Sequence, residues 1–410
     1  MVLLPSTHDR FPALAREPIQ RLGASRIREV ANAAMDDPGV LPFWFGEPDA
    51  VTDPAIREAA KRALDEGDTF YRHNLGTPAL RAALAAYTSR LHRPVDARRI
   101  VVTSSGVSAL MLAAQSILGP GDRVVAVVPL WPNITEIPAI LGASVERVAL
   151  RLDTLDHRWT LDLDQLLAAA RPGTRAVIIN SPNNPTGWTM PAADLAALLE
   201  HCRRHGIWLI SDEAYERLVF DASGCAPSVL DIAQGDDRVI VANTFSKAWQ
   251  MTGWRLGWLT VPDALEPELA KLIEFNTSCA PGFIQQAGVA ALGLGEAPIR
   301  AFVAELKRRR DALLALLQPL PELQVGVPDG GMYLFFRTPG QPDSLALAKH
   351  LVRHAALGLA PGIAFGPEGE AHLRWCFARP IEQLGDGARR LRDGWPRGGA
   401  LRTADRTEPR

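Results

Sequence analysis

Short runs of β-branched and other apolar residues alternate with longer alanine- and leucine-rich segments between about residues 98 and 290. The apolar runs do not alternate with polar positions, which predicts strands that are buried on both faces. Longer segments such as VSALMLAAQSIL and AADLAALLEHCRRHG have the periodicity of helices. The predicted strands are residues 99–104, 123–128, 175–180, 206–211, 238–243 and 257–261.

This alternation predicts an α/β fold with a mainly parallel, helix-covered sheet in a large domain of residues 51–290. Residues 1–50 and 291–395 are expected to form a smaller α/β domain from both chain ends, with a long helix (AFVAELKRRRDALLALL) and short strands around MYLFF and HLRWCFA. The polar tail 396–410 is predicted to be disordered. Ligands of such sheets lie beyond the carboxyl ends of the strands, so functional residues should directly follow the apolar runs.

Composition excludes several classes of protein. Of the 410 residues, 47% are hydrophobic and 22% charged, as in an ordinary soluble enzyme. The net charge of -2 gives no strong attraction to nucleic acid. No apolar run approaches the roughly 20 residues that span a bilayer, and the N-terminal MVLLPSTHDR lacks the basic region of a signal peptide. We therefore expect a cytoplasmic protein with neither a nucleic-acid nor a membrane partner.

Cysteine and histidine spacing gives no sign of a metal site. The cysteines are isolated, without a CxxC pair, which argues against a disulfide framework and a cysteine-rich zinc site. They are Cys202, Cys225, Cys279 and Cys376. The pairs His201/His205 and His350/His354 have helical i,i+4 spacing, but each lies among arginines. We interpret both pairs as solvated helix faces and predict no metal site.

The segment TFSKAWQMTGWRLGW (244–258) follows a predicted strand and contains Lys247 in apolar surroundings. Burial lowers the pKa of a lysine, which activates the amine for attack on an aldehyde. The hydroxyls of Thr244 and Ser246 and the cation of Arg255 suit a phosphate. A single lysine at a strand end is commonly a surface residue, so the prediction depends on the whole run.

Further candidates follow other strands. A buried carboxylate such as Asp212 keeps a pyridinium nitrogen protonated, and Tyr215 one turn later or Asn184 in NSPNNPTG suits a phenolate oxygen. Small residues in TSSGVSAL at the start of a helix suit an anion. Trp131 is suited to stacking on a ring, and Arg374 to clamping a carboxylate. Taken singly, these residues equally fit a helix cap, a turn, core packing or a solvated surface.

Six motifs occur in one order, and together with FGEPD (45–49) they extend over nearly the whole chain. The chain resembles fold-type-I pyridoxal 5'-phosphate (PLP) enzymes, and more narrowly the class I/II aminotransferase family of the aspartate aminotransferase type. The motifs are SGVSAL, PLWPN, SPNNPTG, SDEAY, TFSKAWQMTGWRLGW and HLRWCFA.

The resemblance implies PLP as the cofactor and a role for each matching residue. Lys247 would form an imine with the cofactor and then shuttle a proton. Asp212 would hold the pyridinium nitrogen, Tyr215 and Asn184 the phenolate oxygen, and Trp131 would stack on the ring. The implied reaction moves an amino group between an amino acid and a 2-oxo acid with ping-pong kinetics.

The resemblance also implies binding residues for phosphate and substrate. Arg374 would pair with the substrate α-carboxylate, helped by Asn184 and the backbone N–H of Gly46. Tyr71, in FYRHNLGTPALR, matches a tyrosine that the family contributes to the phosphate of the neighbouring subunit, which implies a homodimer with active sites at its interface. The implied phosphate ligands are Ser105, Gly106, Val107, Thr244, Ser246 and Arg255.

The stretch from Trp131 to Glu146 contains no Lys or Arg and does contain Glu136, which disfavours a dicarboxylate substrate. We therefore expect a neutral or aromatic amino acid donor, although Arg72 of a partner chain offers an alternative cation. A PLP-dependent β-lyase or synthase remains open, because the same lysine and aspartate serve those reactions. A non-enzymatic PLP-binding regulator is a more distant alternative, because we expect no DNA-binding domain before the matching region, which starts near residue 25.

Overall fold

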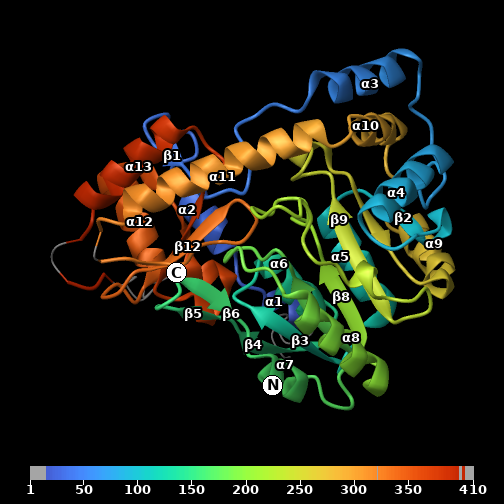
Figure 1. The fold of residues 1–410 in the computed structure, drawn as a ribbon, viewed down its shortest axis with the longest axis horizontal. Coiled ribbons are helices and arrows are strands. Elements are labelled where there is room, and N and C mark those ends of the chain that lie inside the picture. The colour runs from blue at the N-terminus through green and yellow to red at the C-terminus, as the bar shows by residue number, and fades with distance from the viewer. Residues whose placement is uncertain (1–14, 321, 397–398, 402–410) are drawn as a thin grey trace, which may run out of the picture.

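A seven-stranded sheet forms the centre of the larger part of the molecule in the computed structural model, which describes residues 15–320, 322–396 and 399–401 (Figure 1). Its strands run parallel, except for β10, which is antiparallel to both of its neighbours. In sheet order the strands are β2 (Ile100–Thr103), β10 (Gly257–Thr260), β9 (Val239–Thr244), β8 (Trp208–Asp212), β7 (Ala176–Asn180), β3 (Arg123–Val128) and β4 (Ser144–Ala149).

The predicted α/β fold with a mainly parallel sheet is confirmed, and each of the six predicted strands is present with its ends shifted by at most two residues. The seventh strand, β4, was not predicted. It lies at the sheet edge, where Glu146 and Arg147 are only partly buried. Because this strand has a solvated side, it lacks the continuous apolar run of the central strands.

Helices cover both faces of the sheet. Alternate residues of β3 point to opposite sides: Val125 and Val127 enter one core cluster, whereas Val124 and Ala126 enter another. The first cluster includes residues of α7 (Leu163–Ala169) and α8 (Ala192–His205). The second includes residues of α5 (Gly106–Ile117), α6 (Pro132–Ile140) and α9 (Glu266–Glu274).

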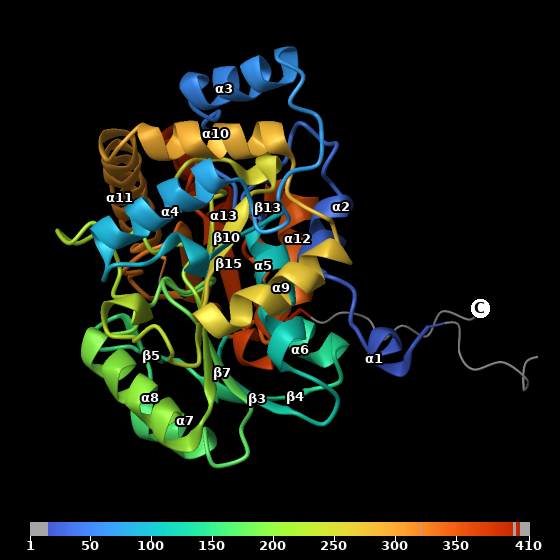
Figure 2. The same cartoon turned by 90° about the vertical axis from the view of Figure 1, so that its right-hand side faces the viewer.

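A third layer lies at the β2 side of the sheet. There α10 packs against α3 and α4, and Figures 1 and 2 both show α3 lying over α10. These helices are α3 (Pro54–Asp65), α4 (Pro78–Leu91) and α10 (Gly282–Gly293).

Segments from the N-terminal and C-terminal parts of the described chain meet in the smaller part of the molecule. A four-stranded antiparallel sheet has the order β11-β12-β15-β14, and α2 from the N-terminal end contacts α12 and β14 (Figure 1). The long predicted helix is present and begins four residues earlier, at Ala297. The domain boundaries given above stay a prediction. The remaining α-helices and strands of the described chain are α1 (Glu17–Gln20), α2 (Arg26–Asn32), β1 (Leu41–Pro42), β5 (Arg151–Asp153), β6 (Arg158–Thr160), α11 (Ala297–Leu317), β11 (Gln324–Val325), β12 (Tyr333–Arg337), α12 (Ser344–Ala355), β13 (Leu357–Gly358), β14 (Ala360–Pro361), β15 (His372–Cys376) and α13 (Ile381–Asp393).

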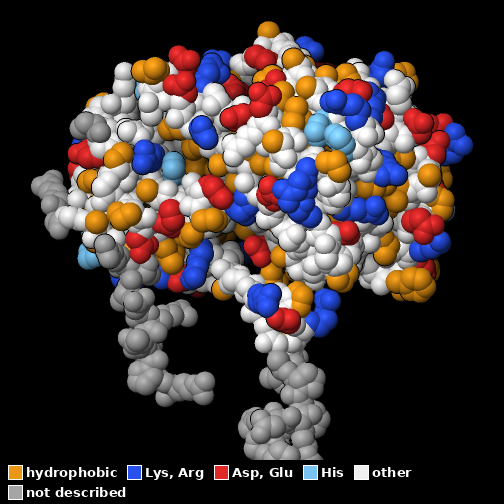
Figure 3. Space-filling view, turned by 90° about the horizontal axis from the view of Figure 1, so that it is seen from below, with side chains coloured by type: hydrophobic (Ala, Val, Ile, Leu, Met, Phe, Trp, Pro, Cys, Tyr) orange, Lys and Arg blue, Asp and Glu red, His pale blue; other side chains and the backbone are white. Residues whose placement is uncertain are grey.

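Most of the predicted disordered tail, together with the N-terminal segment compared above with a signal peptide, lies outside the described residues. Acidic and basic side chains are interspersed over the face seen from below in Figure 3, consistent with the small net charge. No single helix among the described residues combines the length and apolarity needed to cross a membrane. The pair α10 and α11 meets that test only jointly, and the two helices are bent by 80°.

Candidate active site

A cavity of about 650 Å³ opens at the carboxyl edge of the large sheet. The turns that follow β2, β3, β7, β8 and β9 all reach it, as expected where parallel strands end together. Residues of α2 and β12 and Arg374 of β15 close its other side. Of the residues singled out from the sequence, it is lined by Gly46, Gly106, Val107, Trp131, Asn184, Asp212, Tyr215, Thr244, Ser246, Lys247, Arg255 and Arg374.

Lys247 reaches this cavity from the turn that follows β9. Its Nζ donates a hydrogen bond to the carbonyl oxygen of Gly46 at 2.9 Å and lies 5.6 Å from the ring centroid of Tyr215. Burial lowers the pKa of Lys247 to about 8, and the nearby cations of Arg374 and Arg255 act in the same direction. An amine with this pKa is a nucleophile over a pH range in which an exposed lysine is almost fully protonated.

Asp212 is the last residue of β8, and its side chain is buried beside the cavity. Its Oδ1 accepts a hydrogen bond from the backbone N–H of Ala214 at 3.2 Å, and no salt bridge to its carboxylate occurs within the described part of the chain. Burial raises the pKa of Asp212 to about 7, against the opposing effects of that hydrogen bond and of Lys247. A cationic N–H donor placed here would relieve this cost.

Arg374 is a buried cation on the opposite wall. Its Nη1 donates to Asn184 Oδ1 at 3.0 Å and its Nη2 donates to the Trp44 carbonyl, while Nε makes no hydrogen bond. The guanidinium carbon lies 4.4 Å from the ring centroid of Tyr333. Arg374 is 2% exposed and pairs with no carboxylate among the described residues, so its guanidinium group is available to bind an anion in the cavity.

Two phenols adjoin this arginine. The hydroxyl oxygens of Tyr215 and Tyr333 lie 2.7 Å apart, and burial raises the pKa of Tyr333 to about 12 and that of Tyr215 well above its usual value. Both phenols therefore stay protonated and act as hydrogen-bond donors at neutral pH. The position of the Tyr333 hydroxyl leaves room only for glycine at position 46, because a Cβ on Gly46 would lie 1.8 Å from the hydroxyl oxygen.

The start of α5 and the turn after β9 form a small polar cradle. Ser105 caps the helix, with its Oγ accepting from the Ser108 N–H at 3.0 Å. Thr244 Oγ1 lies 2.9 Å from Ser246 Oγ, and Arg255 Nη1 lies 3.5 Å from the same Ser246 oxygen. Helix N–H groups, hydroxyls and a guanidinium around one space are the donor set that a phosphate binds.

Two of the predicted residues do not line the cavity. Tyr71 is 87% exposed, and Ser105 is buried at the start of α5 without lining the cavity. Sequence reasoning also missed lining residues, including Asn180, Asn243 and Arg28. Asn180 and Asn243 end or nearly end their strands, which was an available signal. Arg28 lies in α2, more than 200 residues before Lys247, and no local pattern indicated its proximity.

Comparison with known proteins agrees with this geometry. The profile of the family described as "Aminotransferase class I and II" matches residues 39–391. The chain is 32% identical to the probable aspartate aminotransferase of Methanocaldococcus jannaschii over 88% of this chain and 94% of that protein. It is 34% identical to the arginine–pyruvate transaminase of Pseudomonas aeruginosa over 86% of this chain and 89% of that protein.

A solved structure of a single mutant of Thermus thermophilus aspartate aminotransferase superposes with a TM-score of 0.85 at 31% identity. The match covers 94% of this chain and 100% of that chain. The family profile, the relatives and the shared fold all agree with the order of motifs and the cavity that those motifs line. The chain therefore belongs to the class I and II aminotransferase family, and it is an aminotransferase.

Proposed function

We propose that this aminotransferase uses PLP, held by Lys247, to move an amino group from a neutral or aromatic amino acid to a 2-oxo acid. One observation carries the proposal: Lys247, Asp212 and Arg374 share one cavity, and none of them forms a salt bridge with another described residue. Uncompensated buried charges are costly in a resting protein. They fit a site in which the bound cofactor and substrate supply the opposite charges.

The residues present fit PLP. Lys247 would hold the cofactor covalently through Nζ, and Asp212 would pair with its ring nitrogen. The cradle around Gly106, Ser246 and Arg255 would hold its phosphate, with Trp131 against the ring. When bound, PLP supplies a conjugated ring that accepts the electrons of a breaking Cα–H bond.

The chain's own groups then divide the remaining work. Arg374 binds the substrate α-carboxylate with its planar fork, which fixes the orientation of Cα toward Lys247. Once free, the Lys247 amine takes up the Cα proton as a general base and returns it as an acid, since its pKa of about 8 lies near neutral pH. Tyr215 and Asn184, which line the same cavity as Asp212, would supply hydrogen bonds to the phenolate oxygen of PLP.

The cavity wall supports a neutral or aromatic donor. Ile27, Phe45, Leu110 and Pro132 present apolar surface to it. The segment from Trp131 to Glu146 contributes no cation. An apolar side chain of a substrate would gain about 25 cal/mol for each Å² of surface that it buries against such a wall.

Arg28 favours a second candidate, a donor with a side-chain carboxylate. It lines the same cavity, and its guanidinium carbon lies 4.7 Å from the ring centroid of Phe45. The relatives are named for aspartate and for arginine with pyruvate, so family membership leaves the donor open.

A donor panel distinguishes these two candidates. With one 2-oxo acid acceptor, we expect a higher kcat/KM for phenylalanine or methionine than for aspartate. Replacing Arg28 by leucine should leave the phenylalanine value within about threefold, since this contact is exposed and screened. If aspartate is strongly preferred and Arg28→Leu removes that preference, the second candidate is correct and the first is wrong.

The cofactor and the reaction type have their own test. Purified enzyme supplied with PLP should show a visible absorption band that disappears in Lys247→Ala. A good donor, added without acceptor, should convert that band to the absorption of the amino form of the cofactor. Release of ammonia and pyruvate without an acceptor would instead identify a β-lyase.

We further propose a homodimer with shared active sites and a cytoplasmic location. Tyr71 and Phe70 are 87% and 77% exposed, which supports a role for this segment at a contact between subunits. Light scattering on the purified enzyme checks the assembly, and cell fractionation checks the location.

A further inference from the structure

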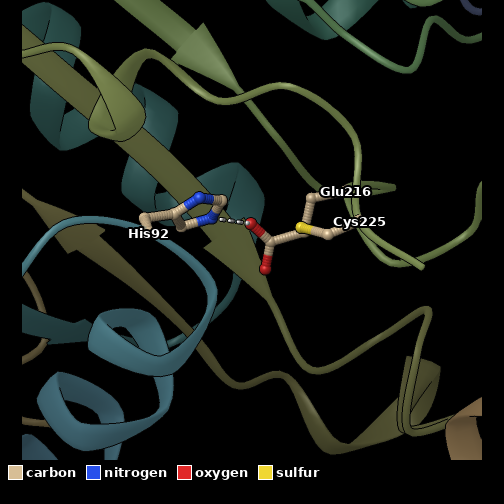
Figure 4. Close-up of side chains that lie close together, drawn as sticks. All are labelled: His92, Glu216 and Cys225. Carbon is tan, nitrogen blue, oxygen red and sulfur yellow. Dashed lines mark ion pairs between the residues drawn. The ribbon is translucent and has the colours of Figure 1, made fainter. Parts of the chain in front are cut away.

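A second group of ionisable side chains lies outside the active-site cavity. It joins His92, at the end of α4, to Glu216 and Cys225, which follow β8, and Figure 4 shows these three side chains converging. Their nitrogen, oxygen and sulfur atoms lie within 4.8 Å of one another. None of the three lines the cavity that holds Lys247.

The imidazole of His92 is oriented by a carboxylate. Its Nδ1 lies 2.8 Å from Asp231 Oδ1, and the His92 side chain is only 2% exposed. Its Nε2 lies 3.5 Å from Glu216 Oε2 and makes no hydrogen bond to any described group. A carboxylate that binds one ring nitrogen while the other faces further ligand atoms is the usual arrangement around metal-bound histidine.

We propose that His92 Nε2, the Glu216 carboxylate and Cys225 Sγ bind a zinc ion, with Asp231 as the positioning residue. In a tetrahedral zinc site, Zn–N of about 2.0 Å and Zn–S of about 2.3 Å place neighbouring ligand atoms roughly 3.3–3.6 Å apart. The 3.5 Å between His92 Nε2 and Glu216 Oε2 already has this length. All pairs of ligand atoms lie within 4.8 Å of one another, so zinc binding requires any longer pair to close by no more than about 1.5 Å.

The ligand set also has the right chemistry for zinc. Imidazole nitrogen, thiolate sulfur and carboxylate oxygen together suit a borderline-soft ion rather than Mg²⁺ or Ca²⁺. The carboxylate and the thiolate neutralise the two positive charges, and binding releases the protons of the ligands to solvent. Water completes the fourth position. Isolated cysteines gave no sign of this site in the sequence, because His92 lies more than 100 residues before Glu216 and Cys225.

The ion would have a structural role. Glu216 directly follows Tyr215, and its carbonyl oxygen accepts the Ala226 N–H at 2.7 Å. Zinc would therefore fasten the end of α4 to the segment that places Tyr215. The competing interpretation is a metal-free charge cluster in which His92 pairs with Asp231 and Glu216 and also interacts with Cys225, and that cluster needs no metal ion.

Zinc binding is measured on the PLP-loaded enzyme, stripped of metal with a chelator and then titrated with Zn²⁺. We expect one zinc per chain to survive desalting, a rise in the unfolding temperature with zinc, and slower alkylation of the Cys225 thiol when zinc is bound. Cys225→Ser and His92→Gln should each abolish the retained ion and the rise. Asp231→Asn should weaken zinc affinity by roughly 10- to 100-fold without changing the stoichiometry.

Cys279→Ser is the matched control, since this partly buried thiol lies elsewhere, 3.3 Å from the Arg72 nitrogen. It should keep both the retained zinc and the rise in unfolding temperature. His201→Gln, at a partly buried histidine that contacts His205 and the Ala170 carbonyl oxygen, should do the same. The proposal is wrong if no zinc is retained, or if zinc is retained equally in Cys225→Ser and His92→Gln. Neither outcome bears on PLP or on amino transfer, which are measured separately in each variant.

Discussion

At the scale of single residues, the active site is defined by charges that the rest of the chain leaves unpaired. Asp212 and Arg374 are 5% and 2% exposed, and each is held by hydrogen bonds rather than by an opposite charge. Burial without a counter-ion shifts the pKa of Asp212 upward and that of Lys247 downward. These shifts make stability and activity depend on the same side chains.

Asp212→Asn tests the free-energy cost of burying this carboxylate without a counter-ion. The pKa of Asp212 is raised to about 7, so its contribution to folding is favourable below the unfolded pKa and is lost as pH rises through about 7. The cofactor-free variant should therefore be more stable than the cofactor-free parent at pH 8, by roughly 1–3 kcal/mol in urea unfolding. Activity should fall at least 100-fold, because the neutral amide no longer stabilises a ring cation. A variant that is less stable at pH 8 would contradict this account.

The depressed pKa of Lys247 predicts a pH dependence of cofactor capture. Only the unprotonated amine attacks an aldehyde, so the rate at which cofactor-free enzyme captures PLP should rise with pH and level off near pH 8. Stopped-flow absorbance measures this rate. Arg374→Gln removes a cation that lowers the Lys247 pKa and should move the plateau to higher pH. A rate that still rises tenfold per pH unit above pH 9 would show that the amine is not perturbed.

At the scale of secondary-structure elements, the cofactor cradle depends on how closely β10 passes the start of α5. Gly257 of β10 pairs with Thr103 of β2 and with Thr244 of β9. A Cβ at Gly257 would lie 2.6 Å from the Gly106 backbone nitrogen and 2.8 Å from the Asn243 carbonyl oxygen. These are backbone atoms that cannot move aside alone, so glycine is required for the helix start to reach its place.

Gly257→Ala should displace the start of α5 and weaken PLP binding. We expect the Kd for PLP to rise about tenfold or more, together with a loss of roughly 1–3 kcal/mol of stability, as in other overpacked sites. Gly293→Ala in α10 is the control, because a Cβ there meets no atom within 4 Å. That control should bind PLP normally. Equal PLP affinity in the two variants would refute the role of this close approach.

At the scale of the whole molecule, one predicted cofactor ligand does not line the cavity of its own chain. Tyr71 has a largely exposed side chain and does not line the active-site cavity. This position agrees with a tyrosine that acts on a neighbouring subunit, as the motif FYRHNLGTPALR implies. The proposed dimer then makes each active site a product of two chains.

Mixing two inactive chains tests the shared site. Lys247→Ala supplies an intact Tyr71, and Tyr71→Ala supplies an intact Lys247. In a mixed dimer one of the two sites then contains both residues. After denaturation and refolding together, the mixture should recover activity beyond the sum of the separately refolded variants, up to about one quarter of the parent at equal mixing. No gain, despite mixed dimers detected by mass spectrometry, would place Tyr71 outside the shared site.

Several features of this protein follow from local sequence alone. Runs such as RVVAVV are apolar at successive positions, and this pattern already specifies a central strand whose two faces are covered. Because parallel strands end at one edge, the residues after each run were expected to meet there, and Asp212, Asn184 and Lys247 do so. The order of the motifs also indicated the protein family, and the comparisons with known proteins confirm that family.

Other features depend on contacts between residues that are far apart in the chain. The solvated edge strand β4, the approach of Arg28 to the cavity and the convergence of His92 with Glu216 and Cys225 have no local signal. Spacing and periodicity report the face on which a residue lies, but not which distant side chain shares that space. Burial is likewise a property of the folded chain, so the unpaired charges of the active site, and the pKa values they acquire, emerge only when the two parts of the molecule close around the cavity.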